Sequence, residues 1–276
     1  MAQTDTPELV LEAGRASRDY WRDLWRYREL LGFLAWRDVK IRYKQTVLGV
    51  LWALIQPVVT LAVFTFIFGK LAGMPSGNAP YPLLVLCGLL PWQLFAAAFS
   101  NASGSLVANT HLIAKVYFPR LIVPLSSVAV ALLDFAITLG LLALLCAWWR
   151  FVPDWRVLLL PLFIVLTLLT AIGTGLWLTA LTVKYRDFRF VVPFLLQIGL
   201  FLSPVGFSST NLPNWQHVYS LNPMVGAIDG FRWCLLHGEP TLDPLNLSVS
   251  VAMSGLLLAS GLWYFRRTER TVADVI

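Results

Sequence analysis

Charged residues are scarce in this chain. Only 13% of its 276 residues are Asp, Glu, Lys or Arg, whereas 58% are hydrophobic. Soluble globular domains usually carry about 25% charged residues, so the composition excludes an ordinary water-soluble protein. The formal net charge is +6, but the basic residues flank apolar runs and form no basic stripe of the kind that binds nucleic acid. We therefore predict an integral membrane protein with no nucleic-acid partner.

Ionisable residues are almost missing from the long apolar runs. Asp134 is the one acidic or basic residue that falls deep within such a run. Ion-coupled carriers and proton pumps normally need several intramembrane ionisable groups, so both classes are disfavoured. A charge at this depth is costly unless it is shielded, and Asp134 is expected to face the bundle interior. Two interpretations stay open: a hydrogen-bonded carboxylate that joins two helices, and a direct role in transport.

Patterns for catalysis and nucleotide binding are also missing. The single Gly-Lys pair, at 69–70, is followed by leucine and lacks the upstream glycine of a phosphate-binding loop. His111, His217 and His237 are scattered, without metal-ligand spacing or a nucleophile partner. The sequence therefore predicts no catalytic residue, no metal ion and no cofactor in this chain. Any ATP and Mg²⁺ would be bound by a separate partner chain.

The three cysteines show no CxxC pattern. We interpret Cys87, Cys146 and Cys234 as small apolar side chains in or near the membrane. A disulfide between Cys146 and Cys234 stays open, because both are predicted to lie near the outer face.

Six apolar stretches are present, and a helix needs about 20 such residues to cross the hydrocarbon core. The fifth stretch is short, and prolines recur inside or at the ends of the stretches. The predicted spans are residues 47–68, 83–103, 121–148, 157–183, 190–205 and 245–265.

Basic residues are distributed unevenly between alternate loops. Seventeen of the 21 Lys and Arg residues fall on one side of the six-span pattern. This is a positive-inside signature, which places both termini in the cytosol. The predicted fold class is thus an all-α integral membrane protein with six transmembrane helices in a single domain at 45–265, followed by a cytosolic tail at 266–276.

The segment before the first span has two parts. Residues 1–25 are polar and are expected to be a loosely ordered cytosolic N-terminus. Residues 26–44 mix apolar and basic side chains with helical spacing, as in an amphipathic helix lying in the membrane interface. The alternative is a cytosolic helix packed on a partner. The residues assigned to this interface helix are Tyr27, Leu30, Leu34, Trp36, Arg37, Lys40 and Arg42.

The cytosolic loop at 104–120 is the best candidate for docking a partner. Residues 107–117 are predicted to form a short amphipathic helix that ends before Phe118-Pro119. Such a helix moves as a rigid body and transmits motion better than an irregular loop. A simple connector helix is the alternative. The residues assigned to this coupling helix are Asn109, Leu112, Ile113, Lys115, Val116 and Tyr117.

The segment at about 206–242 is long and varied. Its Asn-Pro and Leu-Pro turns predict short helices that lie at the outer rim or dip into the bilayer. Asp229 and Arg232 interrupt an apolar stretch at 224–236.

Several segments together resemble one family. RDVKIRYKQTVLGVLWALIQP at 37–57, LIAKVYFPR at 112–120, LNPM at 221–224 and GFRW at 230–233 resemble the membrane subunits of polysaccharide-exporting ABC transporters. The likeness runs in order from about residue 25 to 265. O-antigen, capsule and teichoic-acid exporters share these features, so the resemblance does not select a substrate.

The resemblance implies a homodimer of this chain with two ATP-binding subunits in a bacterial inner membrane. It implies a lipid-linked polysaccharide passing through a channel lined largely by spans one and five. Aromatic rings suit such a path because sugars stack their C–H faces on them. The implied channel residues are Gln56, Phe64, Phe68, Phe194, Gln197 and Phe201. The implied outer gate contains Asn211, Trp215, Asn222 and Pro223.

Other functions fit the sequence less well. A drug or haem exporter of the same superfamily is disfavoured by the segments quoted above. A membrane glycosyltransferase or acyltransferase would need convergent acid, base or metal-binding residues at one membrane face, and the sequence offers none.

Overall fold

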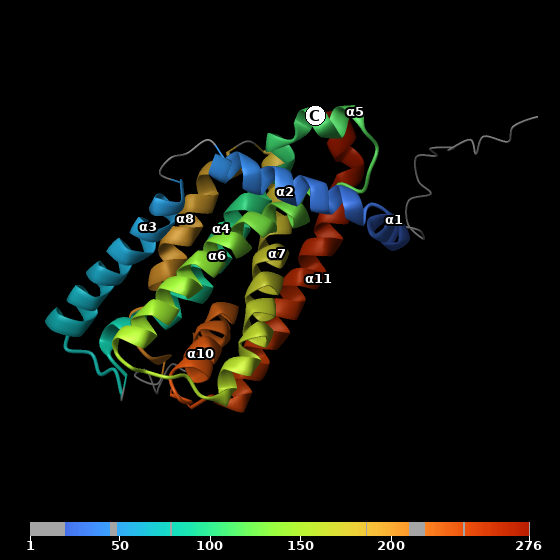
Figure 1. Cartoon of the computed structure of the whole chain (residues 1–276). Helices are drawn as coiled ribbons and strands as arrows, with labels where there is room; N and C mark the ends of the chain where they lie inside the picture. The colour runs from blue at the N-terminus through green and yellow to red at the C-terminus, as the bar shows by residue number, and fades with distance from the viewer. Residues whose placement is uncertain are drawn as a thin grey trace, which may run out of the picture.

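The computed structural model describes residues 20–44, 49–77, 79–185, 187–209, 219–239 and 241–275. These parts of the chain are helical and contain no β-strand, and they form one elongated bundle (Figure 1). The all-α prediction is therefore confirmed.

Within the described residues, five helices are long and apolar enough to cross a membrane. The first combines α3 (Gly49–Phe64) with a π-helical continuation, η1 (Thr65–Leu71). The second and third are α4 (Tyr81–Ala108) and α6 (Ile122–Trp148). The fourth combines a 3₁₀ turn, η2 (Trp155–Leu159), with α7 (Leu160–Lys184), and the last is α11 (Pro244–Val275).

The predicted fifth span is a shorter helix than the others. Helix α8 (Phe188–Phe201) has 14 residues, or about 21 Å at the α-helical rise, whereas the hydrocarbon core is about 30 Å thick. Turns follow at 202–205, a stretch that includes Pro204. Proline has no backbone N–H to donate to a continuing helix. The helix therefore ends at Phe201, before the end of the apolar stretch predicted at 190–205.

Helix α4 forms the centre of the bundle and α3 its edge. In the most apolar window of α4, 72% of residues are buried, against 11% in the span formed by α3 and η1. α4 packs against α6, α7 and α10 (Pro223–Leu235), and α11 packs along α7. Among the described residues, one face of the α3 span is therefore left without a neighbour.

The segment before the last span folds inward. Helix α10 (Pro223–Leu235) packs against α4, α7 and α11, with most of its residues buried. It lies at the end of the bundle opposite to α2 (Arg28–Lys44) and α5 (Thr110–Lys115) (Figure 1). A short helix that lies at the outer rim or dips into the bilayer was predicted here; α10 is buried among the spans, which fits the second alternative.

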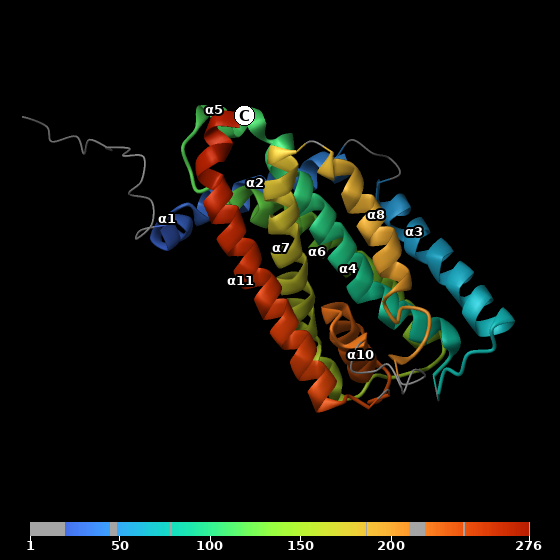
Figure 2. The same cartoon turned by 180° about the vertical axis from the view of Figure 1, so that it is seen from behind.

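Three short helices gather at the other end of the bundle. They are α1 (Tyr20–Arg26), α2 (Arg28–Lys44) and α5 (Thr110–Lys115). The C-terminal end of α11 reaches the same place (Figure 2). Two differences from the sequence interpretation follow: part of the expected loose N-terminus is helical, and the last span continues without a break into the expected tail.

Candidate functional site

Helix α5 occupies the position predicted for the coupling helix but is shorter than expected. α4 continues to Ala108, and Asn109 interrupts the helix with φ −115° and ψ 24°. Val116 is already extended, so the helix covers only Thr110–Lys115. Residues 107–108 belong to α4, and residues 116–117 form an extended segment.

The side chains of α5 and of the segment after it divide between the core and the surface. Leu112 and Ile113 pack against a buried apolar cluster that includes Phe118. Lys115, Val116 and Tyr117 are exposed, Tyr117 with 60% of its surface accessible. The structure thus presents a small basic and aromatic surface at the end of α5 and on the extended segment after it, next to side chains that pack into the core.

The predicted interface helix makes a direct contact with the start of α5. The Nη2 of Arg37 on α2 donates a hydrogen bond of 2.6 Å to the Oδ1 of Asn109. The same guanidinium pairs with Asp38 at 2.7 Å. Two segments that the sequence treats separately are therefore linked.

We expect this link to be measurable by a double-mutant cycle. Arg37→Ala and Asn109→Ala should each lower thermal stability. The double variant should lose less stability than the sum of the two single losses. The interaction energy should be roughly 0.5–1.5 kcal/mol, because hydrogen bonds in proteins contribute about 1 kcal/mol net and Arg37 is partly exposed. Thermal unfolding of the four purified proteins in detergent measures it. Strict additivity would show that the contact contributes nothing.

Helix α2 carries large apolar side chains on both faces. Leu34 is buried against the bundle, whereas Trp36 is 60% exposed, with the Lys40 ammonium 5.3 Å from its ring centroid. Tyr27 and Leu30 are half-buried against the apolar cluster that contains Leu34. An outer face with exposed aromatic and basic residues suits a lipid surface, where Trp and basic side chains lie at the headgroup level.

Asp134 joins α2 to α6. Its Oδ2 lies 2.6 Å from the Nη2 of Arg42, and Tyr43 donates a hydrogen bond to its Oδ1. Burial, together with this hydrogen bond to a carboxylate, raises the pKa of Tyr43 to about 12. Asp134 is shielded, as expected, with its side chain 19% exposed, but its partners lie on α2 and not on another span. Its contacts are those of a carboxylate that holds two helices together.

A second group of contacts, unforeseen from the sequence, fixes the segment after α5. The backbone N–H of Arg120 donates to Oε1 of Glu269 at 2.9 Å, and its guanidinium bonds the backbone carbonyl of Glu269. The Arg266 guanidinium lies 4.7 Å from the ring centroid of Tyr20, which is 7% exposed. α1, α11 and the segment after α5 therefore form one unit.

The predicted channel residues fall into two groups. Gln56, Phe194, Gln197 and Phe201 are exposed on α3 and α8. Phe64 and Phe68 are only partly exposed. Their ring centroids are 5.5 Å apart, and Phe68 also lies 6.4 Å from Phe207. Four of the six are thus free on the surface of the single chain, and the other two pack where η1 meets the segment after α8.

The predicted outer gate is described only in part. Asn211 and Trp215 lie outside the described residues. Asn222 is the N-cap of α10: its Oδ1 accepts from the Met224 backbone N–H at 3.0 Å, and its Nδ2 donates to Ser203 Oγ at 3.0 Å. Pro223 is the first residue of α10. These two residues connect the end of α8 to the start of α10.

Arg232 is the functional candidate that sequence reasoning missed. Its side chain on α10 is fully buried. Nη1 and Nη2 donate to the carbonyls of Phe207 and Val205 at 2.7 and 2.8 Å, and Nε donates to that of Leu84 at 3.3 Å. Arg232 thus clamps the segment after α8 onto α4. The signal in the sequence was a basic residue three positions after Asp229 within an apolar run.

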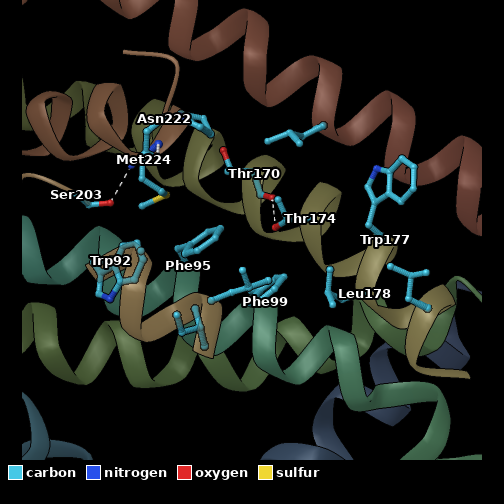
Figure 3. A pocket seen from close by; sticks show the side chains of 16 residues that line it. Trp92, Phe95, Phe99, Thr170, Thr174, Trp177, Leu178, Ser203, Asn222 and Met224 are labelled. Atoms are coloured by element: carbon cyan, nitrogen blue, oxygen red, sulfur yellow. Dashed lines mark hydrogen bonds between the residues drawn. The ribbon is translucent and has the colours of Figure 1, made fainter. Parts of the chain in front are cut away.

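A groove of about 500 Å³ lies between α4, α7, α8, α11 and the start of α10. Figure 3 shows Trp92, Phe95 and Phe99 of α4 along one wall and Thr170, Thr174 and Trp177 of α7 along another. No residue of the predicted channel set lines this groove; of the predicted gate, Asn222 and Pro223 do.

The described residues contain no group of three or more His, Cys, Asp or Glu side chains that could hold a metal ion. Cys87, Cys146 and Cys234 are buried free thiols, so the disulfide left open by the sequence is not formed. Within the described part of the chain, the candidate site consists of exposed helix faces and polar side-chain contacts between helices and the segments that join them.

These features define a multi-pass helical membrane protein. A family model described as ABC-2 type transporter matches residues 29–236, and the chain belongs to this family. The predicted resemblance to an ABC transporter permease is thereby confirmed.

Named relatives cover most of the chain. It is 29% identical to the O-antigen export system permease protein RfbA of Myxococcus xanthus over 252 residues, which are 90% of this chain and 96% of the relative. A protein of the same name from Klebsiella pneumoniae is 26% identical over 253 residues, covering 90% and 95%. The polysialic acid transport protein KpsM of Escherichia coli is 25% identical over 242 residues, covering 86% and 92%.

Proposed function

We propose that this chain is the membrane subunit of an ATP-driven exporter that moves a lipid-linked polysaccharide from the cytosol across the bacterial inner membrane. The observation that carries the proposal is the family match together with end-to-end similarity to permeases named for O-antigen and polysialic acid transport. The absence of a phosphate-binding loop in the sequence supports a separate ATP-binding partner.

The proposed assembly is a homodimer with two ATP-binding subunits. The exposed faces of α3 and α8 support the dimer, because Gln56 and Gln197 are exposed there on otherwise apolar helices. Amides exposed to lipid hydrocarbon lack hydrogen-bond partners, whereas such side chains serve well at helix–helix interfaces. The same faces also carry the exposed rings of Phe194 and Phe201, on which sugars would stack in the channel.

The partner ATPase would dock on α5 and the segment after it. Support comes from the exposure of Lys115, Val116 and Tyr117 and from the contacts that fix this unit to α2 and α11. Because the end that carries α5 is rich in basic residues, the positive-inside rule assigns it to the cytosol.

Cells lacking this chain are expected to accumulate the lipid-linked glycan in the cytosol and to lose it from the surface. Extraction and mass spectrometry of carrier-linked glycans measures the accumulation. The tagged chain should also co-purify with an ATP-binding protein. Normal surface glycan in the deletion strain, or isolation of an active catalyst without any ATPase, would contradict the proposal.

The orientation can be tested separately. In a Lys115→Cys variant, an impermeant thiol reagent added outside intact cells is expected to leave position 115 unlabelled, and lysis should expose it. The three native thiols are buried and give a low background. Labelling from outside would invert the topology and leave the ATPase without a docking surface.

A further inference from the structure

The groove between α4, α7, α8 and α11 has features of a ligand site rather than of a packing defect. Its volume of about 500 Å³ lies within the range of small-molecule sites, which are roughly 300–1,000 Å³ and mainly apolar. The rings of Phe95 and Phe99 are stacked along α4, with centroids 5.7 Å apart and planes 6° from parallel. Half of the remaining lining residues are aromatic or leucine.

The hydroxyls of Thr170 and Thr174 and the indole N–H of Trp177 already have hydrogen-bond partners within the protein. Thr170 Oγ1 bonds the Leu166 carbonyl and lies 2.9 Å from Ser254 Oγ. Thr174 Oγ1 donates to the Thr170 carbonyl at 2.8 Å, and Trp177 Nε1 donates to Ser260 Oγ at 3.1 Å. A sugar would gain few hydrogen bonds here, so the groove favours an occupant without polar groups.

The position of the groove restricts that occupant to a lipid. Three of the helices that wall it are spans of the membrane protein, and Leu195 at its edge is 44% exposed. At about 30 Å³ for a group the size of a water molecule, the volume holds a chain of about sixteen methylene groups. This is the size of one phospholipid acyl chain.

Basic residues continue the groove toward the end of the bundle that carries α2 and α5. On α7, the lining residues Trp177, Leu178 and Leu181 follow helical spacing, and Lys184 is the next residue of that stripe. On α8, Arg189 precedes the lining residue Leu196 by seven positions and shares its face. Both basic side chains are exposed and form no ion pair with a described residue. The Lys184 ammonium lies over the ring of Tyr185. They are placed to meet an anionic headgroup.

We propose that this groove binds the acyl chain of an anionic phospholipid, whose phosphate lies at Lys184 and Arg189. The site is separate from the predicted channel residues, none of which lines the groove, although Asn222 and Pro223 of the predicted outer gate do. The bound chain fills the space beside a helix that is too short to span the membrane. It thereby supports α8 from the side away from the channel.

The test uses the full transporter complex in nanodiscs with phosphatidylglycerol carrying a diazirine on one acyl chain. Photolysis followed by peptide mass spectrometry is expected to label the α7 and α8 residues of the groove. Leu178→Trp should reduce this labelling at least fivefold by filling the groove. The matched control is Leu162→Trp on the same helix, where Leu162 is 64% exposed and does not line the groove; it should leave the labelling unchanged.

The headgroup is tested with Lys184→Ala/Arg189→Ala and with competing unlabelled lipids. Unlabelled phosphatidylglycerol should compete at least threefold better than phosphatidylcholine, and the double variant should abolish this preference. Size-exclusion profiles like those of the parent complex establish that each variant is folded. Three results would each overturn the proposal. They are labelling spread equally over lipid-facing residues such as Leu162, equal competition by both lipids, and displacement of the probe only by an isoprenoid phosphate.

Discussion

Replacing Arg232 by methionine is expected to abolish export and to lower the free energy of unfolding by about 3–5 kcal/mol, the range found when one partner of a buried charged group is removed. Methionine keeps much of the volume but none of the donors. The carbonyls of Leu84, Val205 and Phe207 would lose their partner, and buried polar groups without partners are costly. Thermal unfolding in detergent and an export assay in cells measure the two effects.

Two variants make this test specific. Lys70→Met removes an exposed positive charge from the end of the α3 span and should leave stability within about 0.5 kcal/mol of the parent, as expected for surface substitutions. Arg232→Lys keeps the charge but not the planar fork of donors, so its stability should fall between those of the parent and Arg232→Met. An Arg232→Met protein as stable as the Lys70→Met protein would show that the clamp is not needed.

A substitution at Gly88 tests the same Arg232 contacts independently. A Cβ added at this position would lie 2.8 Å from both the Nη2 of Arg232 and the carbonyl oxygen of Val205. Gly88→Ala should therefore destabilise the protein by displacing the contact. Because the two residues touch, the costs of Gly88→Ala and Arg232→Met should not add.

The sequence predicted the elements that depend on local composition. Long apolar runs located five helices that can cross a bilayer, because length and hydropathy determine which helices can do so. Helices also lie at the segments predicted as the interface helix and the coupling helix, but their roles stay predictions. Helix ends were less accurate: Asn109 ends α4 and begins α5 within a stretch that was interpreted as one helix.

The contacts between distant segments were not predictable in this way. Arg37 and Asn109 are 72 positions apart, and Arg120 and Glu269 are 149 positions apart. Nothing in the local spacing of these residues signals a partner. The sequence shows Arg232 only as an interruption of an apolar stretch, which says nothing about its depth within the fold. Its burial results from the packing of α10 against α4, α7 and α11.

Replacing Ile113 by proline is expected to reduce export at least tenfold while leaving membrane insertion intact. The Ile113 backbone N–H donates to the Asn109 carbonyl at 3.1 Å. Proline removes this donor and its ring clashes with the carbonyl four residues earlier. Since α5 covers only Thr110–Lys115, loss of this turn would unwind most of the helix.

The comparison with Ile113→Ala separates the contribution of the helical backbone to export from that of the Ile113 side chain. Alanine keeps the backbone hydrogen bond and the helical turn but removes the contacts with the apolar cluster around Phe118, so it should reduce export less than proline does. If α5 transmits force as a rigid body, the proline variant should keep its ATP-binding partner hydrolysing ATP while export stops. Export at the parent rate in Ile113→Pro would show that the surface around Lys115 does not couple ATP hydrolysis to transport. Equal losses in both variants would place the function in the side chain of Ile113 and not in the helix.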